Sequence, residues 1–259
     1  MKVYQRSELT KIIKLVTESK ILDVIGLIVV IGGSIYLGFH NTIKPLNFLG
    51  FSTENYPLGI QSVVTVGFSM LATRFVTRRK NLGNFIGVFT TISTCMVDYM
   101  LGNQAAILTY PVSMLGNYYS YYSWNKQKEV VPIGIDKGFF INFIYGFLIS
   151  ITLNYIGFTN FLSEPITKFT LFITSVIIGG LTFGAQFNTA MRYKDNWFTW
   201  QIYNGFKFYQ NFCLGNIAYM LKYIFYFFNA LLGWLNWTDV KNEIDFNKQN
   251  EIQLNEVKI

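Results

Sequence analysis

The sequence predicts an all-α polytopic membrane protein with eight transmembrane helices, arranged as one N-terminal helix and a 3+1+3 core of two parallel repeats. Three observations lead to this prediction: the composition, the spacing of the charge-poor runs and an internal repeat. Of the 259 residues, 51% are hydrophobic, only 14% are charged and just 5 are prolines. Soluble domains carry about 25% charged residues, so this composition is typical of a chain that lies mostly in a bilayer.

Eight mostly apolar runs are separated by short polar segments. Several runs are shorter than the about 20 residues that a helix needs to cross a bilayer, but uncharged polar flanks can extend most of them. We expect the transmembrane helices at 24–39, 58–73, 84–97, 105–123, 138–157, 170–187, 196–212 and 217–237.

The positive charges predict the orientation of these helices. If the N-terminus is cytoplasmic, seventeen of the 21 lysines and arginines fall in cytoplasmic segments, and only Lys44 and Lys168 fall in outer segments. Cytoplasmic loops of membrane proteins carry such an excess of positive residues. We therefore expect both termini in the cytoplasm. The net charge of +7 then reflects topology, and we expect no nucleic-acid partner.

The N-terminal part, residues 1–57, is expected to be an addition to the core. Residues 1–20 alternate charged and apolar positions, which is typical of an amphipathic helix on the membrane surface. Residues 41–57 contain two prolines and a glycine, which favour an extracellular loop. Because no cleavage site ends the first apolar run, we expect that run to stay in the membrane.

From residue 58 onward the sequence repeats itself, without a gap, under one fixed shift along the chain. This repeat shift places LGNQA at 101–105 on LGNIA at 214–218, and Trp124 on Trp237. Such a repeat predicts two copies of one structural unit.

The repeat divides the chain into five expected parts. They are the N-terminal addition at 1–57, the first three-helix repeat at 58–124, a linker helix with its loops at 125–169, the second three-helix repeat at 170–237 and a mobile cytoplasmic tail at 238–259. The single linker helix gives both triplets the same direction across the membrane. Paired bundles of this kind place a substrate site at their interface, and rocking gives alternating access.

The stretch RYKDNWFTWQIYNGFKFYQN at 192–211 gathers tryptophans and amides within an apolar sequence. In a helix, Trp197, Trp200, Asn204 and Asn211 fall on one face. An amide that faces lipid costs several kcal/mol, so we expect this face to point inward toward a ligand. The alternative is that the tryptophans mark the membrane interface and the asparagines join helices.

The repeat shift places small and polar residues opposite this aromatic face. A flat ligand that stacks on one wall and reaches polar groups on the other fits this asymmetry. The candidate substrate-binding residues are Trp197, Trp200, Gln201, Asn204, Asn211, Asn84, Thr91, Asp98, Asn117 and Asn229.

The sequence resembles the PnuC family of bacterial vitamin transporters over residues 58–237. The similar segments are NWFTWQIYN and YIFYFFNALLGWLNW in the second repeat and RRKNLGNFIGVF and NYYSYYSWNKQ in the first. The most specific element is the spacing of Trp197, Trp200 and Asn204, which in the family belongs to the substrate-binding helix.

This resemblance implies a full-length relative of the SWEET sugar carriers in the bacterial cytoplasmic membrane. It further implies facilitated diffusion of nicotinamide riboside, assembly as a homotrimer, and a cytoplasmic kinase that traps the vitamin by phosphorylation. Riboflavin, thiamine or a deoxynucleoside are alternative ligands, because each of them also stacks on indole rings.

Two lysines lie within predicted transmembrane helices. Lys207 falls at the edge of the aromatic face, where it repels a cationic ligand unless it is paired or turned away, and Lys222 raises the same question. Pairing with Asp98 is one solution.

We expect neither an enzyme nor a metal or cofactor site. The one histidine, His40, has no partner ligands in sequence, Cys95 and Cys213 show no metal-binding spacing, and HExxH and GxSxG motifs do not occur. A channel or a purely structural membrane protein remains a distant alternative.

Overall fold

The computed structural model describes residues 7–48, 51–160 and 169–256. Within these ranges the chain forms nine α-helices, one short 3-10 helix at Phe39–Asn41 and one β-hairpin. The helices are α1 (Glu8–Glu18), α2 (Lys20–Tyr36), α3 (Leu58–Thr77), α4 (Leu82–Met100), α5 (Ala106–Asn125), α6 (Lys137–Asn160), α7 (Phe169–Met191), α8 (Asn196–Cys213) and α9 (Ile217–Glu256).

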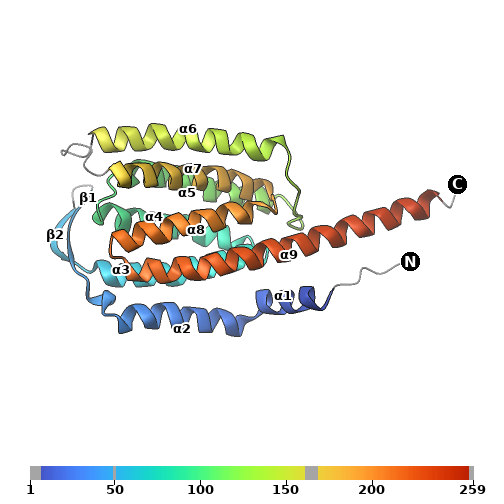
Figure 1. Ribbon diagram of the computed structural model, residues 1–259, viewed down its shortest axis with the longest axis horizontal. Helices are drawn as coiled ribbons and strands as arrows, with labels where there is room; N and C mark the ends of the chain where they lie inside the picture. Colours follow the sequence, from blue (N-terminus) through green and yellow to red (C-terminus); the bar gives the residue numbers. More distant parts are fainter. Residues whose placement is uncertain (1–6, 49–50, 161–168, 257–259) are drawn as a thin grey trace.

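Helices α2 to α9 lie side by side along the long dimension of the molecule (Figure 1). Helix α1 and the C-terminal part of α9 project at the same end of this bundle. A helix lies on each of the eight ranges expected to cross the membrane. Four of them, α3, α6, α7 and α9, are long and apolar enough to cross a membrane by length and composition.

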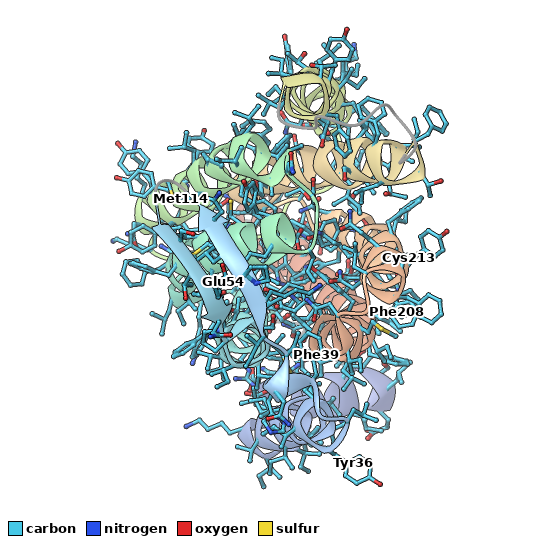
Figure 2. The ribbon with its side chains drawn as sticks, turned by 90° about the vertical axis from the view of Figure 1, so that its left-hand side faces the viewer. Tyr36, Phe39, Glu54, Met114, Phe208 and Cys213 are labelled. Atoms are coloured by element: carbon cyan, nitrogen blue, oxygen red, sulfur yellow. The ribbon has the colours of Figure 1, made fainter. Side chains whose placement is uncertain are left out.

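The opposite end of the bundle carries the hairpin formed by β1 (Lys44–Phe48) and β2 (Phe51–Tyr56), which pair antiparallel. This hairpin lies within the segment at 41–57 that we expected to be an extracellular loop. Pro45 lies at the register irregularity between Lys44 and Leu46, and Pro57 follows β2, so neither proline has to donate a hydrogen bond to the ladder. Figure 2 looks onto this end and shows Tyr36 and Cys213 pointing outward from the bundle, where both are exposed.

The described part of the C-terminal segment, residues 238–256, is helical, where we expected a mobile tail. Helix α9 continues without a break for 40 residues, so its end at residue 237 was wrongly predicted. No glycine or proline interrupts residues 238–256, and Lys241 pairs with Asp245 one turn later at 2.5 Å. Helix α1 packs against α9.

We call α3, α4 and α5 the first triplet and α7, α8 and α9 the second triplet. The ends of their first two helices correspond closely under the repeat shift, and so do their unusual backbone angles, whereas α9 runs well past the position that matches the end of α5. Arg79 (φ 59°) and Arg192 (φ 69°) end the first helix of each triplet in the left-handed region. Gly102 (φ 101°) and Gly215 (φ 69°) end the second helix.

The glycine pair explains why the LGN segment occurs twice. A left-handed residue after a helix favours glycine, because a side chain is strained there. The next residue then closes the turn: Asn103 donates its N–H to the carbonyl of Asp98, and Asn216 donates to that of Asn211, both at 2.9 Å. Each triplet therefore turns from its second to its third helix by the same motif.

The two triplets contact each other in a reciprocal way. Helix α5 packs on α7, and α9 packs on α3. The buried indole of Trp124 donates to the carbonyl of Thr189 at 2.9 Å, and that of Trp237 donates to the carbonyl of Thr77 at 3.1 Å. The two rings lie 5.8 Å apart. The third helix of each triplet thus carries a tryptophan that is held by the other triplet.

A charged cluster fixes the N-terminal helices to the first triplet. Asp23 of α2 accepts from Arg74 Nε at 2.5 Å and from Arg78 Nη2 at 2.6 Å. Both guanidinium groups also donate to the carbonyl of Thr17, at 2.7 and 2.8 Å. These bonds satisfy carbonyl groups at the end of α1 that the helix itself leaves free. The sequence analysis did not detect this cluster.

Replacing Asp23 with alanine leaves two largely buried guanidinium groups without their carboxylate. We expect this variant to lose about 3 to 5 kcal/mol of stability, measured as a lower unfolding temperature in detergent. Glu8→Ala is the control, because its ion pair with Lys11 is exposed and contributes at most about 1 kcal/mol. Equal unfolding temperatures for both variants would contradict this role of Asp23.

Candidate functional site

A cavity of about 220 Å³ lies between the two triplets and is lined by side chains from all six of their helices. Asn154 of the linker helix α6 adds to the lining. Pockets for drug-sized ligands measure about 300 to 1,000 Å³, so this cavity suits a smaller compound. The lining combines aromatic rings, hydroxyl groups and carboxamides, and among the described residues it contains two lysines and no aspartate or glutamate.

Helix α8 supplies the aromatic wall, as its sequence predicts. Trp197 and Trp200 both line the cavity, but they do so differently. Trp197 is 5% exposed and packs edge-on against Trp237, with ring centroids 5.6 Å apart. It also covers Gly233, where any larger side chain would collide with the indole ring. Trp197 therefore has a structural role in addition to lining the cavity.

The ring of Trp200 is only partly buried, which leaves it the more available of the two indoles. Its Nε1 donates to Thr189 Oγ1 at 3.3 Å, and its ring meets that of Tyr203 at 5.3 Å. One edge of the indole is thus fixed by α7 while the ring lines the cavity. This arrangement holds a flat surface in place for a stacked ligand.

Asn204 lies one turn after Trp200 and also lines the cavity, with 3% of its surface exposed. No described residue forms a hydrogen bond with its carboxamide. Buried amides are normally hydrogen-bonded, so a free one at a cavity is available to a ligand.

The first triplet forms the opposite wall. Asn84, Thr91 and Asn117 all line the cavity, as expected. Asn117 Nδ2 donates to Thr91 Oγ1 at 2.8 Å, and Thr91 in turn donates to the carbonyl of Gly87 at 2.7 Å. Asn84 donates to Asn81 Oδ1 at 3.0 Å. These groups keep further acceptor and donor capacity toward the cavity.

Four of the expected site residues do not line the cavity. Asn211 is fully buried and donates to the carbonyl of Lys207 in its own helix at 2.8 Å. Asn229 donates to Thr77 at 2.8 Å and accepts from Arg74 at 3.0 Å. Gln201 lies about 100° around the helix from Trp200, which turns it away. The fourth residue is Asp98.

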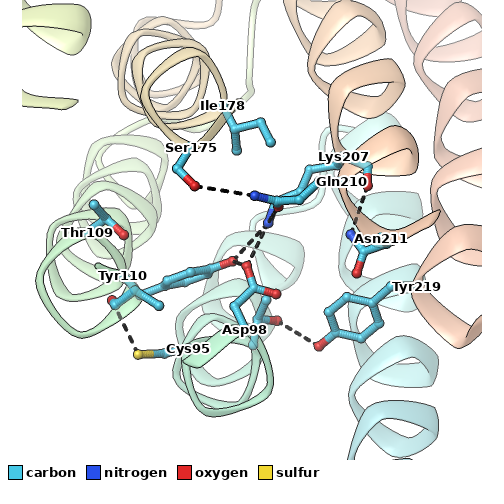
Figure 3. Close-up of polar contacts among 12 residues, drawn as sticks. Cys95, Asp98, Thr109, Tyr110, Ser175, Ile178, Lys207, Gln210, Asn211 and Tyr219 are labelled. Carbon is cyan, nitrogen blue, oxygen red and sulfur yellow. Dashed lines mark hydrogen bonds and ion pairs between the residues drawn. The ribbon is translucent and has the colours of Figure 1, made fainter. Parts of the chain in front are cut away.

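Asp98 is buried and paired with Lys207, as the sequence analysis suggested. Lys207 Nζ donates to Asp98 Oδ2 at 2.7 Å and to Gln210 Oε1 at 2.8 Å, and the Tyr110 hydroxyl donates to the same carboxylate oxygen. Gln210 also donates to Ser175 at 3.4 Å. Figure 3 shows these side chains converging between the two triplets. The network joins α4, α5, α7 and α8, and the pairing neutralises Lys207 at the cavity.

The sequence analysis missed the contribution of α7. Its polar lining residues follow helical spacing, at Ser175, Thr182, Gln186 and Thr189, beside Ile178, Gly179 and Phe183. Gln186 donates to Ser113 Oγ of α5 at 2.7 Å, which joins the triplets. Polar residues that recur after seven, four and three positions are the signal that predicts this face.

A second polar contact holds the loops at the other end of the triplets. The Tyr193 hydroxyl donates to Asp136 at 2.5 Å, and residue 133 pairs with the backbone beside Tyr193. Burial, helped by the nearby carboxylate, raises the pKa of Tyr193 to about 12. The hydroxyl of Tyr193 in turn lowers the pKa of Asp136. Both shifts keep the donor protonated and the acceptor ionised around neutral pH.

Among the described residues, no group of three or more histidine, cysteine, aspartate or glutamate side chains is placed to hold a metal ion. Nothing in the described part of the cavity lining resembles a catalytic set of nucleophile and base. The arrangement suits reversible binding of a small polar aromatic compound.

Asp98→Asn and Lys207→Met should each destabilise the protein by about 3 to 5 kcal/mol, because either change leaves one buried charge without its partner. The double variant should lose much less than the sum of the two. A double-mutant cycle of unfolding temperatures or denaturant midpoints measures this coupling. Purely additive losses would show that the two residues do not stabilise each other.

Comparison with known proteins identifies the family and a solved structure with the same fold. The family model described as nicotinamide mononucleotide transporter matches residues 59–239, which contain nearly all of the first triplet and the second triplet as far as residue 239. A solved structure titled crystal structure of the vitamin B3 transporter PnuC superposes with a TM-score of 0.64 at 14% identity. The alignment covers 92% of this chain and 99% of that one, and it shows a shared fold. A comparison with curated proteins gives no match.

The family match covers more than half of the chain, and its extent agrees with the segments whose sequence resembles the PnuC family. The predicted family is therefore confirmed, and with it the prediction of a helical membrane protein that acts in transport. The chain belongs to the nicotinamide mononucleotide transporter family.

Proposed function

We propose that this protein carries nicotinamide riboside across the cytoplasmic membrane by facilitated diffusion with alternating access. The observation that carries the proposal is the cavity between the triplets, where the ring of Trp200 and the free carboxamide of Asn204 lie one helical turn apart. A pyridinium ring on the indole face gains about 0.5 to 2 kcal/mol from cation–π attraction. The Asn204 carboxamide, one turn further along α8, can then form hydrogen bonds with the ligand's amide or ribose hydroxyl groups.

The proposal also covers the arrangement of the helices in the membrane and the way in which the cavity opens to either side. We propose that α2 to α9 all cross the membrane, that the two triplets are parallel repeats as in full-length relatives of the SWEET carriers, and that both termini are cytoplasmic. The Trp124–Trp237 pair joins the triplets near the ends of α3 and α7, and the Asp98–Lys207 pair joins them near the opposite end of α4. Alternating access requires these two contacts to loosen in turn.

The driving force in this proposal is consumption of the vitamin inside the cell. Coupling to an ion normally uses intramembrane carboxylates. The described lining contains no aspartate or glutamate, and Asp98, outside the lining, is paired with Lys207. A cytoplasmic kinase that phosphorylates the riboside would keep its internal concentration low. We further propose a homotrimer, as the family resemblance implies.

A second candidate is a carrier of an uncharged flat compound, such as riboflavin or a deoxynucleoside. The observation that favours it is the presence of two lysines in the described lining without an acidic residue. Titrating the purified protein with each compound and following tryptophan fluorescence separates the two candidates. Quenching by riboflavin or a deoxynucleoside, without quenching by nicotinamide riboside, would remove the first candidate.

Trp200→Ala should weaken binding of nicotinamide riboside by about tenfold, because the stacking surface is lost. The measurement is isothermal titration calorimetry on the purified protein. Trp234→Ala is the matched control: this indole donates to Asp195 at 3.2 Å and packs on Phe198, outside the cavity. Unchanged affinity in the Trp200 variant would argue against a substrate site at this wall.

Replacing each of two asparagines of α8 with alanine should affect different properties, ligand affinity for Asn204 and stability for Asn211. Asn204→Ala is expected to weaken ligand binding by about three- to tenfold with little change in unfolding temperature, because no hydrogen bond within the protein is lost. Asn211→Ala should lower the unfolding temperature, because this buried side chain bonds its own helix. The same pattern of losses in both variants would refute the assignment of Asn204 to the ligand.

A further inference from the structure

Arg74 of α3 is buried at a point where four helices meet. The residue is 4% exposed. Its Nε donates to Asp23 of α2 at 2.5 Å, and its Nη2 donates to the carbonyl of Thr17, at the end of α1, at 2.7 Å. Its Nη1 donates to Asn229 Oδ1 of α9 at 3.0 Å. Because a buried guanidinium group is costly to leave without its partners, these bonds hold the four helices together.

Asn229 belongs to one of the contacts between the triplets, the packing of α3 on α9, which we call the α3–α9 seam. Three side chains of α9 bond Thr77 at the end of α3. Asn229 donates to the Thr77 hydroxyl at 2.8 Å, and Asn236 and Trp237 donate to the Thr77 carbonyl, both at 3.1 Å. Helix α2 packs on both α3 and α9, and α1 packs on α9 (Figure 1). The N-terminal helices therefore lie across this seam.

The packing of α5 on α7 is the equivalent contact on the other side of the cavity, and its bonds are uncharged. Ser123 donates to the carbonyl of Ala190 at 3.0 Å. Under the repeat shift this bond matches the one from Asn236 to Thr77. The duplicated part of the chain thus closes both contacts between the triplets in the same neutral way.

The charged contact is an addition to the α3–α9 seam alone. Under the repeat shift, Phe187 stands in place of Arg74 and Gly116 in place of Asn229. The carboxylate that Arg74 requires comes from Asp23, which lies before residue 59, where the match to the transporter family begins. Neither α1 nor α2 contributes a described residue to the cavity lining. Their attachment to Arg74 thus affects how the triplets move, not what the ligand contacts.

We propose that α1 and α2 clamp the α3–α9 seam, and that the ion pair of Asp23 with Arg74 restrains the cavity from opening at the end of the bundle where α1 projects. The inference rests on the proposed alternating access, but not on which compound is carried. Rocking of the triplets separates α3 from α9 at that end. Separation breaks the bond between Arg74 and Asn229 while Asp23 holds Arg74 in place, which slows the opening.

Labelling of a cysteine in the cavity measures this opening and needs no ligand. In Thr73→Cys the thiol lies in the cavity lining, next to Arg74 in sequence. The purified full-length protein in lipid nanodiscs is treated with a charged methanethiosulfonate reagent, and mass spectrometry follows the modification of each cysteine over time. The two native cysteines are internal controls. Cys213 is exposed and reacts in every variant, whereas Cys95 is buried outside the described lining and reacts only if the whole bundle loosens.

Two further substitutions should shift the labelling rate in opposite directions. Asp23→Asn removes the negative charge of the clamp, so the cavity cysteine should react about tenfold faster, as the loss of a charged hydrogen bond allows. Asn229→Asp gives Arg74 a second carboxylate across the seam, so the same cysteine should react about threefold more slowly. Asp136→Asn is the matched control and should leave the rate unchanged. The repeat shift places Asp23 on Asp136, whose described side-chain partner is the hydroxyl of Tyr193 and not an arginine.

The inference is overturned if folded Asp23→Asn leaves labelling of the cavity cysteine unchanged, or raises it only together with labelling of Cys95. Unchanged or faster labelling in Asn229→Asp would likewise show that Arg74 does not restrain the seam. If Asp23→Asn does not fold, the result for Asn229→Asp decides. Failure of nicotinamide riboside to bind would remove the proposed ligand and leave the clamp standing, because the labelling uses no ligand.

Discussion

The structure depends on the need to satisfy polar side chains inside an apolar bundle. The outer surfaces of the helices carry exposed isoleucine, leucine and phenylalanine side chains, whereas asparagine, glutamine, serine and threonine are buried between the helices. A polar group left facing hydrocarbon is costly, so these residues must bond to one another or line a cavity. The inter-triplet bonds of Gln186, Lys207 and Trp124 follow from this requirement. At the cavity some polar side chains have no hydrogen-bond partner among the described residues, and Asn204 is one of them.

The sequence predicts those parts of the fold and site that local patterns determine. The LGN turns could be matched because a glycine with positive φ recurs at each, and Trp200 and Asn204 could be placed together because helical spacing sets one face. Contacts between distant helices were less predictable. Spacing alone puts Asn211 on the ligand face, and it cannot reveal that Asn229 has partners on α3. The pairing of Asp23 with Arg74, 51 residues away, leaves no local signal.

The two triplets share one backbone plan but have different side chains. At corresponding positions the second triplet places Trp197, Trp200 and Lys222 where the first places Asn84, Gly87 and Thr109, and all six line the same cavity. The small residues of one wall leave room for the rings of the other. Shape and charge in the cavity are therefore unequal on its two sides. The shared backbone of the two triplets encloses the cavity, and the side chains that differ between them determine which groups a ligand meets.

The uninterrupted course of α9 has a mechanical consequence. A helix of 40 residues is about 60 Å long, and its first half contains the cavity residues Lys222, Tyr226 and Ala230. Its second half projects beyond the bundle beside α1 (Figure 1). Because no break separates the halves of this helix, a small tilt at the cavity would displace the projecting end by a larger distance.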